Sequence, residues 1–406
     1  MVTKTLNLTA NVDLFPDFKI DLSADRTYAN NYSEQFNATD IPDANGNYYQ
    51  PQSPYSFGNF SISAVMLKSS FKASDENSSS SFQDFRENRI IIADRLAQQY
   101  YGGPNYPRYG DATNPVPIPT DPNYNFYANN LGYPIGFGKN NQAVLIPSFL
   151  AAYTGLYSTG AGDAAKGVSL DAFRNFPIPN WTIKYSGLMR YKFFKERFKR
   201  FSIQHAYRAS YTINSFRSNL DYNPNVAIQD NSGIGNFFNN TIIANINLVE
   251  QFNPLIRIDF EMKNAFKILA EIKKDRSLSM SFDNNLLTEV QGREYIVGVG
   301  YRFKDVIFSS QLADNPTGII KSDINLKIDI SYRNNKTIVR YLDYDNNQLG
   351  GGQNIWSAKL TADYSLSKNL TAIFFYDHSF SKPVISTSFP LTNVRAGFTM
   401  RYNFGN

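Results

Sequence analysis

Apolar and polar residues alternate along much of this chain. In residues 181–193 the apolar side occupies the odd positions: Trp181, Ile183, Tyr185, Gly187, Met189, Tyr191 and Phe193. Residues 323–333 and 394–404 alternate in the same way, and eleven further segments do so less cleanly. A period of two is typical of β-strands whose two faces meet different surroundings. The pattern therefore predicts an all-β protein with about 14 antiparallel strands.

The predicted strands are long and charged on one face. Strands of soluble proteins average roughly 5–6 residues, whereas a membrane-spanning strand needs roughly 9–11. Arg257, Asp259 and Glu261 share the polar side of one segment. An apolar stripe opposite such charges fits a lipid-facing exterior and a water-filled interior. A large soluble sheet covering a core would also alternate, but strand length favours a transmembrane antiparallel β-barrel.

Aromatic residues are abundant, with 32 Phe, 27 Tyr and 2 Trp in 406 residues. Their spacing predicts two belts at the membrane interfaces. At roughly 3.3 Å per residue and a tilt of about 40°, the separations from 181 to 193 and from 356 to 364 span about 20–30 Å, close to the apolar band of outer-membrane barrels. The predicted aromatic girdle consists of Trp181, Tyr191, Phe193, Trp356 and Tyr364.

Connections between the strands alternate between short and long. The predicted short periplasmic turns are 14–17, 194–199, 252–254, 333–336 and 367–369, with 263–265 as a tight turn on the outer side. The predicted long extracellular loops are 33–54, 217–240, 304–321 and 379–390. With this count, the segment between strand 56–68 and Trp181 has to cross the membrane region once, as a hidden strand or through the barrel lumen.

Residues 70–180 interrupt the alternation and divide the chain into barrel strands 1–69, an insertion 70–180 and barrel strands 181–406. We expect a polar linker at 73–80, a helix from a capping Ser81 through Ala97, and a short helix 146–153 with Pro147 in its first turn. The insertion either fills the lumen or contacts a partner, or it is a loop that packs on the barrel wall. Candidate gate or partner residues on the helices are Phe85, Ile92, Leu96, Phe149 and Tyr153.

Composition excludes several kinds of chemistry. The chain has no Cys and two His, and its net charge is +5, so we expect no catalytic site, cofactor, metal or nucleic acid. His205 and His378 are expected to be structural. The basic run 190–200 fits anionic lipid headgroups better than nucleic acid. No stretch approaches a membrane helix, and the residues after Met1 lack the apolar core of a signal peptide.

The last predicted strand ends in a recognisable pattern. Its residues resemble the signal by which outer-membrane barrels are inserted: Gly397, Phe398, Met400, Tyr402 and Phe404. An exposed edge strand allows pairing with an assembly machinery.

Several longer stretches, spread in order over about 60–406, are similar to one family. They include FQDFRENRIIIADRL at 82–96, VLIPSFLAAYTG at 144–155, PNWTIKYSGL at 179–188 and FSIQHAYRASY at 201–211. The chain resembles the C-terminal portion of the SprA/Sov translocon of type IX secretion, which is also linked to gliding motility in Bacteroidota. The resemblance implies that these strands are a segment of a larger transmembrane barrel, and it implies an outer-membrane location in a Gram-negative bacterium and export of folded cargo proteins. It also implies two partners, a PorV-type shuttle barrel and a periplasmic plug protein.

Three alternatives remain open from the sequence. The chain could be an autonomous barrel of about 14 strands that transports a small apolar or sugar solute. It could be a soluble β-rich surface or adhesion protein. A barrel hydrolase would need a Ser, His and Asp arrangement whose geometry nothing in the sequence defines.

Overall fold

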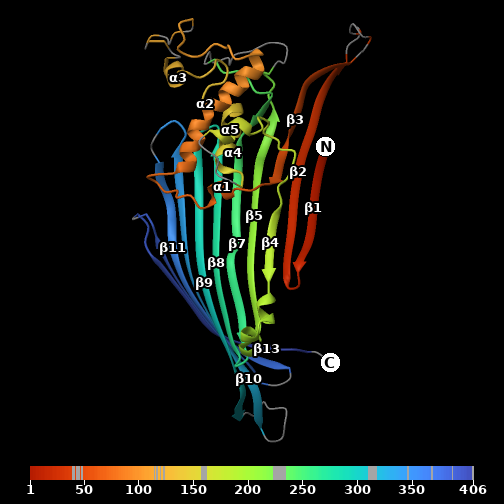
Figure 1. Ribbon diagram of the computed structural model, residues 1–406, viewed down its shortest axis with the longest axis vertical. Helices are drawn as coiled ribbons and strands as arrows, with labels where there is room; N and C mark the ends of the chain where they lie inside the picture. The colour runs from red at the N-terminus through yellow and green to blue at the C-terminus, as the bar shows by residue number, and fades with distance from the viewer. Residues whose placement is uncertain are drawn as a thin grey trace.

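The computed structural model shows one large antiparallel sheet with a small group of helices on its upper part (Figure 1). It describes residues 1–404 apart from 39–41, 43–45, 47–48, 114, 116–117, 119, 122–123, 157–161, 223–234, 310–317, 345–346, 367–368 and 386. None of the helices among these residues has the length and hydropathy needed to cross a membrane. The expectation of an all-β antiparallel protein is confirmed.

The described residues form thirteen strands and six α-helices with one 3-10 turn. The strands are β1 (Val2–Phe15), β2 (Phe18–Ala38), β3 (Tyr49–Ser63), β4 (Asn180–Tyr185), β5 (Phe198–Ser218), β6 (Thr241–Ile243), β7 (Asn245–Met262), β8 (Phe266–Ser281), β9 (Leu286–Ser309), β10 (Ile319–Tyr341), β11 (Asn347–Ser365), β12 (Leu370–Pro383) and β13 (Leu391–Tyr402). The helices are α1 (Leu67–Ser70), α2 (Ser80–Tyr101), α3 (Tyr124–Asn129), α4 (Gln142–Tyr153), α5 (Asp163–Gly167), η1 (Gly187–Arg190) and α6 (Lys192–Arg197).

The sheet is open. Its order is β1-β2-β3-β5-β7-β8-β9-β10-β11-β12-β13, with β4 between β2 and β5 and β6 beside β5. Among the described residues, β1 and β13 each pair with one neighbour and not with each other. The chain therefore has two free strand edges, and the described strands do not close into a barrel.

Strands β3 and β4 occupy a single position in the sheet. Ser63, the last residue of β3, lies opposite Ser210 of β5, while Trp181 of β4 lies opposite Tyr207. The residues of β2 that lie opposite Ser63 and Asn180 are separated by one residue, and the same is true in β5. The sheet therefore has space for a single residue between Ser63 and Asn180. The Asn180 amide also donates to Ser63 Oγ at 3.4 Å. The segment between them, 64–179, which we call the helical unit, leaves and rejoins the sheet at one point.

This geometry corrects the predicted topology. Both ends of the helical unit lie at the same place, so it does not cross the membrane region, and no hidden strand exists among its described residues. The predicted strand 181–193 is also too long, because β4 ends at Tyr185 and the chain turns through η1 and α6. There Phe194 packs on Phe198 and Phe201, at 5.6 and 5.0 Å between ring centroids.

Two predicted turns lie inside strands. Residues 252–254 form a bulge within β7, and 333–336 run straight through β10. Both neighbours of β10 continue past Asn334, so ladder hydrogen bonding outweighs the turn preference of an Asn pair.

The turn 263–265 lies at the lower end of the sheet, with the C-terminus. The strands flanking 304–321 also meet there, so the predicted outer positions of these two connections are wrong.

The helical unit packs on the upper half of the sheet through a continuous apolar core. Helix α2 begins after Ser79, whose Oγ accepts the Phe82 N–H at 3.3 Å, so the predicted cap at Ser81 is displaced by two residues. Helix α4 begins after Asn141, which places Pro147 in the helix middle instead of its first turn. The buried core joins both helices to β3, β5, β7, β8 and β9.

Candidate functional site

The two faces of the sheet differ sharply in character. Strand β8 pairs with β9 without a bulge, so its alternating side chains define the faces. Even positions such as Leu278 and Met280 join the core beneath the helices, and we call this side the helix face. Odd positions such as Glu271 and Lys273 point to the opposite side, which we call the charged face. The helical unit therefore covers the apolar side of the sheet, which agrees with the alternative of an insertion that packs on the wall.

An ion-pair ladder crosses five strands on the charged face. Its closest contacts are Arg200–Asp259 at 2.7 Å and Arg333–Asp275 at 2.9 Å. Between them the ladder runs through Arg257, Glu271, Lys273 and Glu294 at 3.4–4.0 Å. Gly292 makes space for it, because a Cβ there would lie 2.5 Å from the Asp275 carboxylate. This face is suited to contact with water.

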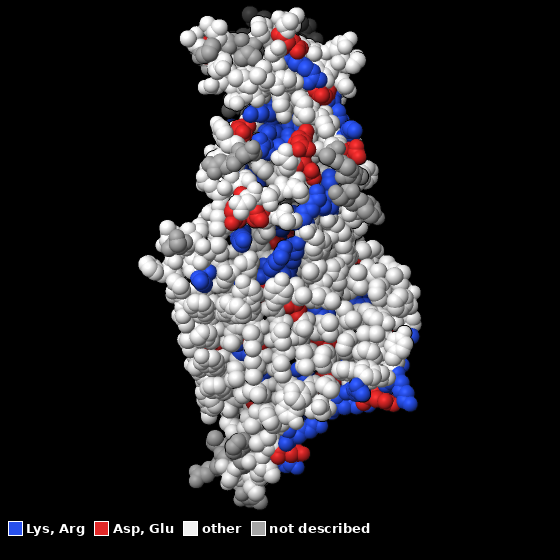
Figure 2. Space-filling view, turned by 60° about the vertical axis from the view of Figure 1, so that its left-hand side comes forward, with Lys and Arg blue, Asp and Glu red and all other residues white. Residues whose placement is uncertain are grey.

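The lower half of the helix face is apolar and exposed. We call it the apolar belt; it includes Val297 and Val299 of β9, Ile328 and Ile330 of β10, Leu360 of β11, Phe374 and Tyr376 of β12, and Phe398 and Met400 of β13. Val297 is 52% exposed and Ile330 53%. Figure 2 shows a broad uncharged zone below a charged upper part, with Lys and Arg again at its lower margin. Soluble proteins rarely expose so large an apolar patch.

Aromatic residues border the apolar belt. Along its upper margin, Tyr295, Tyr332, Trp356 and Phe380 are direct neighbours in four consecutive strands. The Tyr332 and Trp356 ring centroids lie 4.4 Å apart. Eight residues further along their strands, Phe303 and Tyr364 flank Ile324 in register. At roughly 3.3 Å per residue and a tilt of about 40°, these margins are about 20 Å apart.

The predicted girdle residues separate into two groups. Trp356 and Tyr364 lie at the two margins of the apolar belt. Trp181 instead stacks on Tyr207 at 4.5 Å and packs against the core beneath the helical unit. Tyr191 and Phe193 lie beyond the end of β4 and are exposed, Tyr191 at the start of α6 and Phe193 within it. The three were expected on one strand, and that strand ends before two of them.

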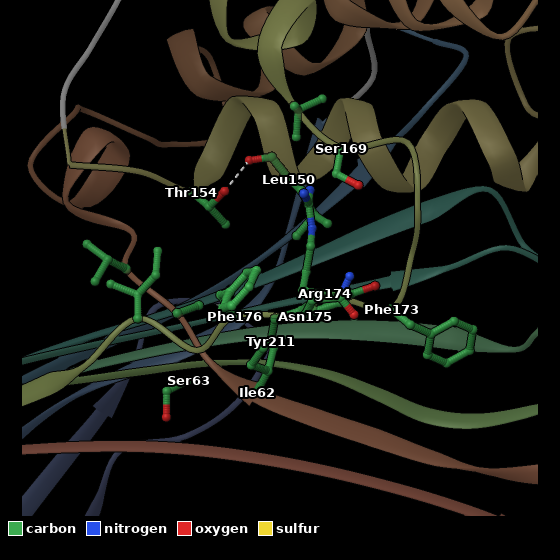
Figure 3. A pocket seen from close by; sticks show the side chains of 14 residues that line it. Ile62, Ser63, Leu150, Thr154, Ser169, Phe173, Arg174, Asn175, Phe176 and Tyr211 are labelled. Atoms are coloured by element: carbon green, nitrogen blue, oxygen red, sulfur yellow. Dashed lines mark hydrogen bonds between the residues drawn. The ribbon is translucent and has the colours of Figure 1, made fainter. Parts of the chain in front are cut away.

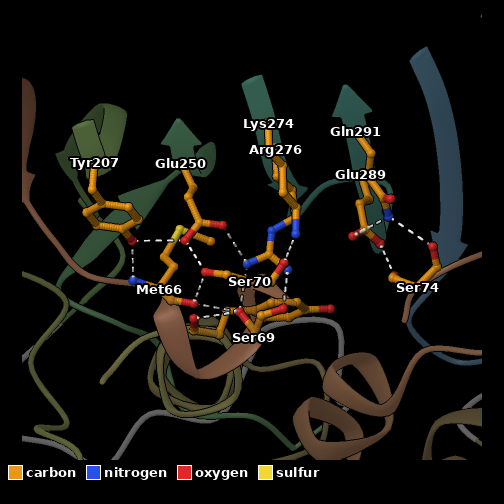
Figure 4. Close-up of polar contacts among 11 residues, drawn as sticks. Met66, Ser69, Ser70, Ser74, Tyr207, Glu250, Lys274, Arg276, Glu289 and Gln291 are labelled. Carbon is orange, nitrogen blue, oxygen red and sulfur yellow. Dashed lines mark hydrogen bonds and ion pairs between the residues drawn. The ribbon is translucent and has the colours of Figure 1, made fainter. Parts of the chain in front are cut away.

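A buried polar seam lies directly above the upper aromatic margin. It joins the segment 66–75 of the helical unit, which includes α1, to β5, β7, β8 and β9 (Figure 4), and to β10 through Arg340. The Tyr207 hydroxyl accepts the Met66 N–H at 2.8 Å and donates to Glu250 at 2.9 Å. Arg276 donates to the Ser69 carbonyl at 3.1 Å and to Ser69 Oγ at 2.7 Å. Ser70 Oγ donates to Glu250, and Lys274 Nζ donates to the Ser70 carbonyl.

The second half of the seam centres on Ser74. Its Oγ donates to Glu289 at 2.7 Å and accepts from Arg340 at 2.8 Å. Arg340 also pairs with Glu289 at 3.0 Å and donates to the Asp75 carbonyl at 3.0 Å. Gln291 donates to the Ser74 carbonyl at 3.0 Å. Arg340 and Glu289 are both 0% exposed. Four strands, β7 to β10, therefore present charged side chains to this short segment, and β5 adds the neutral Tyr207 hydroxyl.

The seam holds the helical unit in place, although two of its buried nitrogen atoms lack a hydrogen-bond partner in the described part of the chain. Among the described residues, Arg276 Nε and Arg340 Nη1 are buried without a hydrogen-bond partner. Removing charges from water costs free energy that such pairs regain only with good geometry and complete hydrogen bonding. The seam therefore specifies where the loop docks more than it adds net stability.

The predicted helix residues are interior. Phe85, Ile92 and Phe149 are fully buried, and Phe85 meets Phe149 edge to face at 6.1 Å between centroids. Tyr153 is buried under the Arg276 guanidinium, and burial raises the pKa of its hydroxyl. Leu96 packs partly buried in a second cluster between α2, α4 and α5. These side chains hold the helices together and offer no exposed partner surface.

The C-terminal strand residues lie at a free edge. In β13, Phe398, Met400 and Tyr402 lie on the helix face with the apolar belt, while Gly397 lies on the charged face under the Phe375 ring. Phe404 follows the strand and is exposed. Both His make local contacts, His205 Nδ1 with the Leu255 carbonyl at 2.6 Å and His378 with the Tyr376 hydroxyl at 3.4 Å. No group of three metal-ligating side chains occurs within the described part of the chain.

Comparisons with known proteins do not identify a family. No family model matches this chain, and no curated protein matches it. The site therefore has to be interpreted from its geometry.

Sequence reasoning missed the seam, although a signal for it was present. The even positions of β8 are apolar at Ile268, Ala270 and Ile272, then charged at Lys274 and Arg276, then apolar again at Leu278. Charged residues at apolar positions in the middle of a strand predict that another polar segment packs on the sheet beside them, because burying an isolated charge costs too much free energy.

Proposed function

We propose that this chain is the C-terminal barrel portion of an outer-membrane translocon that exports folded proteins, of the SprA/Sov type of type IX secretion. The observation that carries the proposal is the two-sided sheet. One face has an apolar belt with aromatic margins, suited to lipid, and the other has a charge-compensated wall, suited to water. The proposed location is the outer membrane of a Bacteroidota-like bacterium.

The open edges favour a wide wall over a small closed barrel. A solute-importing barrel needs a closed ring of strands, whereas β1 and β13 are free edges among the described residues. Strands β9 and β10, at 24 and 23 residues, also far exceed the roughly 9–11 that cross a bilayer. The excess length carries the helical unit beyond the proposed membrane. A soluble adhesion protein would not leave the apolar belt exposed.

The position of the helical unit supports one partner more than another. It lies on the same face as the proposed lipid-contacting belt, above the upper aromatic margin. Such a place fits contact with a neighbouring membrane protein, and we assign it to a smaller shuttle barrel of the PorV type. A periplasmic plug protein and the secreted cargo would meet the charged face instead.

A deletion of residues 65–179 in the bacterium that encodes the chain tests this function. Ala64 then bridges Ser63 to Asn180, as the register of β2 and β5 allows. We expect the shortened protein to reach the outer membrane while cargo disappears from the extracellular proteome, measured by mass spectrometry of both fractions.

Deleting the whole chain is the second arm of this experiment. Normal export without the chain would overturn the translocon proposal altogether. Normal export with only 65–179 removed would overturn the role of the helical unit and leave the rest of the proposal standing.

A further inference from the structure

A cavity of about 330 Å³ lies where the helical unit leaves the sheet. Its walls come from the end of β3, from α4, from the loop 168–178 and from Tyr211 of β5 (Figure 3). Most of the lining is apolar and includes Leu150, Phe173, Phe176 and Ile178. The volume lies at the lower end of the range of small-molecule sites, about 300–1,000 Å³.

Several polar groups in the lining are already engaged. Thr154 Oγ1 donates to the Leu150 carbonyl at 2.6 Å. Ser63 Oγ accepts the Asp25 N–H at 2.9 Å, and Ser169 Oγ accepts the Asp171 N–H at 3.2 Å. These hydroxyls hold the protein's own backbone in place, so they are not the groups that would choose a ligand.

Two donors in the same lining have no acceptor among the described residues. The Tyr211 side chain is 1% exposed, and its hydroxyl has no hydrogen-bond partner. The Arg174 guanidinium has no hydrogen bond or ion pair there either, and its side chain reaches toward Leu150 of α4 (Figure 3). The carboxylate three residues away, Asp171, accepts the Phe173 N–H at 2.9 Å; its charge acts on Arg174 without forming an ion-pair contact.

The loop that carries Arg174 is anchored, so the donor is held in place. Arg26 Nε of β2 donates to the Arg174 carbonyl at 2.9 Å, and the Ile178 N–H donates to the Ser63 carbonyl at 3.1 Å. The Phe173 ring packs on Phe216 and Phe60 of the sheet, at 5.0 and 5.5 Å between centroids. Burial lowers the pKa of Arg174, and a bound anion would offset that loss of hydration.

We propose that this cavity binds a carboxylate attached to a compact apolar or aromatic group, with Arg174 and Tyr211 donating to the carboxylate oxygens. A guanidinium matches the two oxygens of a carboxylate in a planar fork, and a neighbouring hydroxyl can add a third donor. The apolar walls would accept the body of such a ligand. The site rests on the fold alone and does not depend on the export function.

Binding of 3-phenylpropionate to the full chain in lipid nanodiscs, followed by isothermal titration calorimetry, tests the proposal. We expect saturable binding that weakens at least tenfold in Arg174→Gln and severalfold in Tyr211→Phe. The matched control is Arg208→Gln, which removes a charge from the charged face of the same strand as Tyr211 and should bind as the wild type does. Circular dichroism of each variant verifies that the sheet is folded.

Two competing probes define the ligand class. The neutral 3-phenylpropanol should bind at least tenfold more weakly, because it offers no anion to Arg174. Phenyl phosphate should bind no more tightly than the carboxylate. The proposal is overturned by equal binding of acid and alcohol, by tighter binding of the phosphate, by unchanged affinity in folded Arg174→Gln, or by no binding of the acid to the wild type.

Discussion

The lower and upper halves of the helix face invert the usual placement of apolar and charged side chains. Below the aromatic margin, Val297 and Ile330 are about half exposed. Above it, Arg340 and Glu289 are completely buried. A water-soluble protein would place these two kinds of residue the other way round. The comparison teaches that burial changes along a single strand, from exposed apolar surface, which the proposed lipid contact would cover, to a covering of protein.

The largest expected effect comes from breaking the seam. Arg340→Met leaves Glu289 as a buried, unpaired carboxylate, which costs about 3–5 kcal/mol. We expect the helical unit to become susceptible to limited proteolysis while the sheet stays intact. The matched control is Arg333→Met on the charged face of the same strand, where the ion pair is partly exposed and surface pairs contribute about 0–1 kcal/mol.

The double variant Arg340→Met with Glu289→Met sharpens this test. It removes both charges, so protection against proteolysis should return. Equal protease resistance of Arg340→Met and wild type would show that the buried pair does not control docking.

The second effect tests the lower half of the face. Ile330→Lys places a charge in the apolar belt, where lipid contact makes it cost about 2–4 kcal/mol. We expect a smaller membrane-inserted fraction in lipid vesicles, measured by flotation and by heat-modified gel migration. Ser331→Lys points to the charged face of the same strand and should insert normally. Equal insertion of the two variants would contradict lipid contact at the belt.

A smaller effect is expected where the helical unit begins its long helix. Ser79→Ala removes the acceptor for the Phe82 N–H, and loss of such a cap costs about 1 kcal/mol. The neighbouring Ser78→Ala retains the backbone N–H that donates to Asp75 at 2.8 Å and serves as the control. Hydrogen exchange at the first turn of α2 should rise only in Ser79→Ala. Unchanged exchange would show that the docked loop fixes the helix start by itself.

The smallest effect is a dependence on pH. The N–H groups of Ser78 and Asn77 donate to the Asp75 carboxylate and lower its pKa. A lowered pKa contributes stability above the ordinary value of about 3.9, and this contribution is lost as pH falls through the lowered value. We expect proteolysis of the loop 71–79 by an acid-active protease to rise more steeply below pH 4 in wild type than in Asp75→Asn. Parallel profiles would remove Asp75 as the cause.

Much of the sheet could be predicted from the sequence, because period-two alternation reports directly on two-sided surroundings. The strands containing Ile330 and Phe398 were predicted in this way, with their faces correct. Local turn preferences misled at Asn334-Asn335, where pairing with neighbours on both sides keeps the chain extended. They also misled at Asn253-Pro254, which lie in a bulge of β7 whose flanking residues remain paired. These are tertiary effects that a single strand does not encode.

The position of the helical unit could not be read from alternation. Its ends, Ala64 and Pro179, meet because two neighbouring strands leave a one-residue gap, and such a register becomes visible only in the assembled sheet. The cavity donors Arg174 and Tyr211 are 37 residues apart with no motif between them. Both helices could be predicted. The side of the sheet that they cover is indicated by the charged residues Lys274 and Arg276 at apolar positions of β8, and these charges were not interpreted as a docking site.

The ion-pair ladder has a consequence for anything that moves along the wall. Arg200, Arg257 and Lys273 each face a carboxylate on the same or a neighbouring strand, so the surface presents alternating signs a few ångströms apart. Such a field decays quickly with distance and holds neither acidic nor basic segments strongly. If the chain forms the wall of the proposed translocon, such a surface would be hydrated without binding either sign of charge strongly, and a folded cargo protein of any net charge would pass it without being retained.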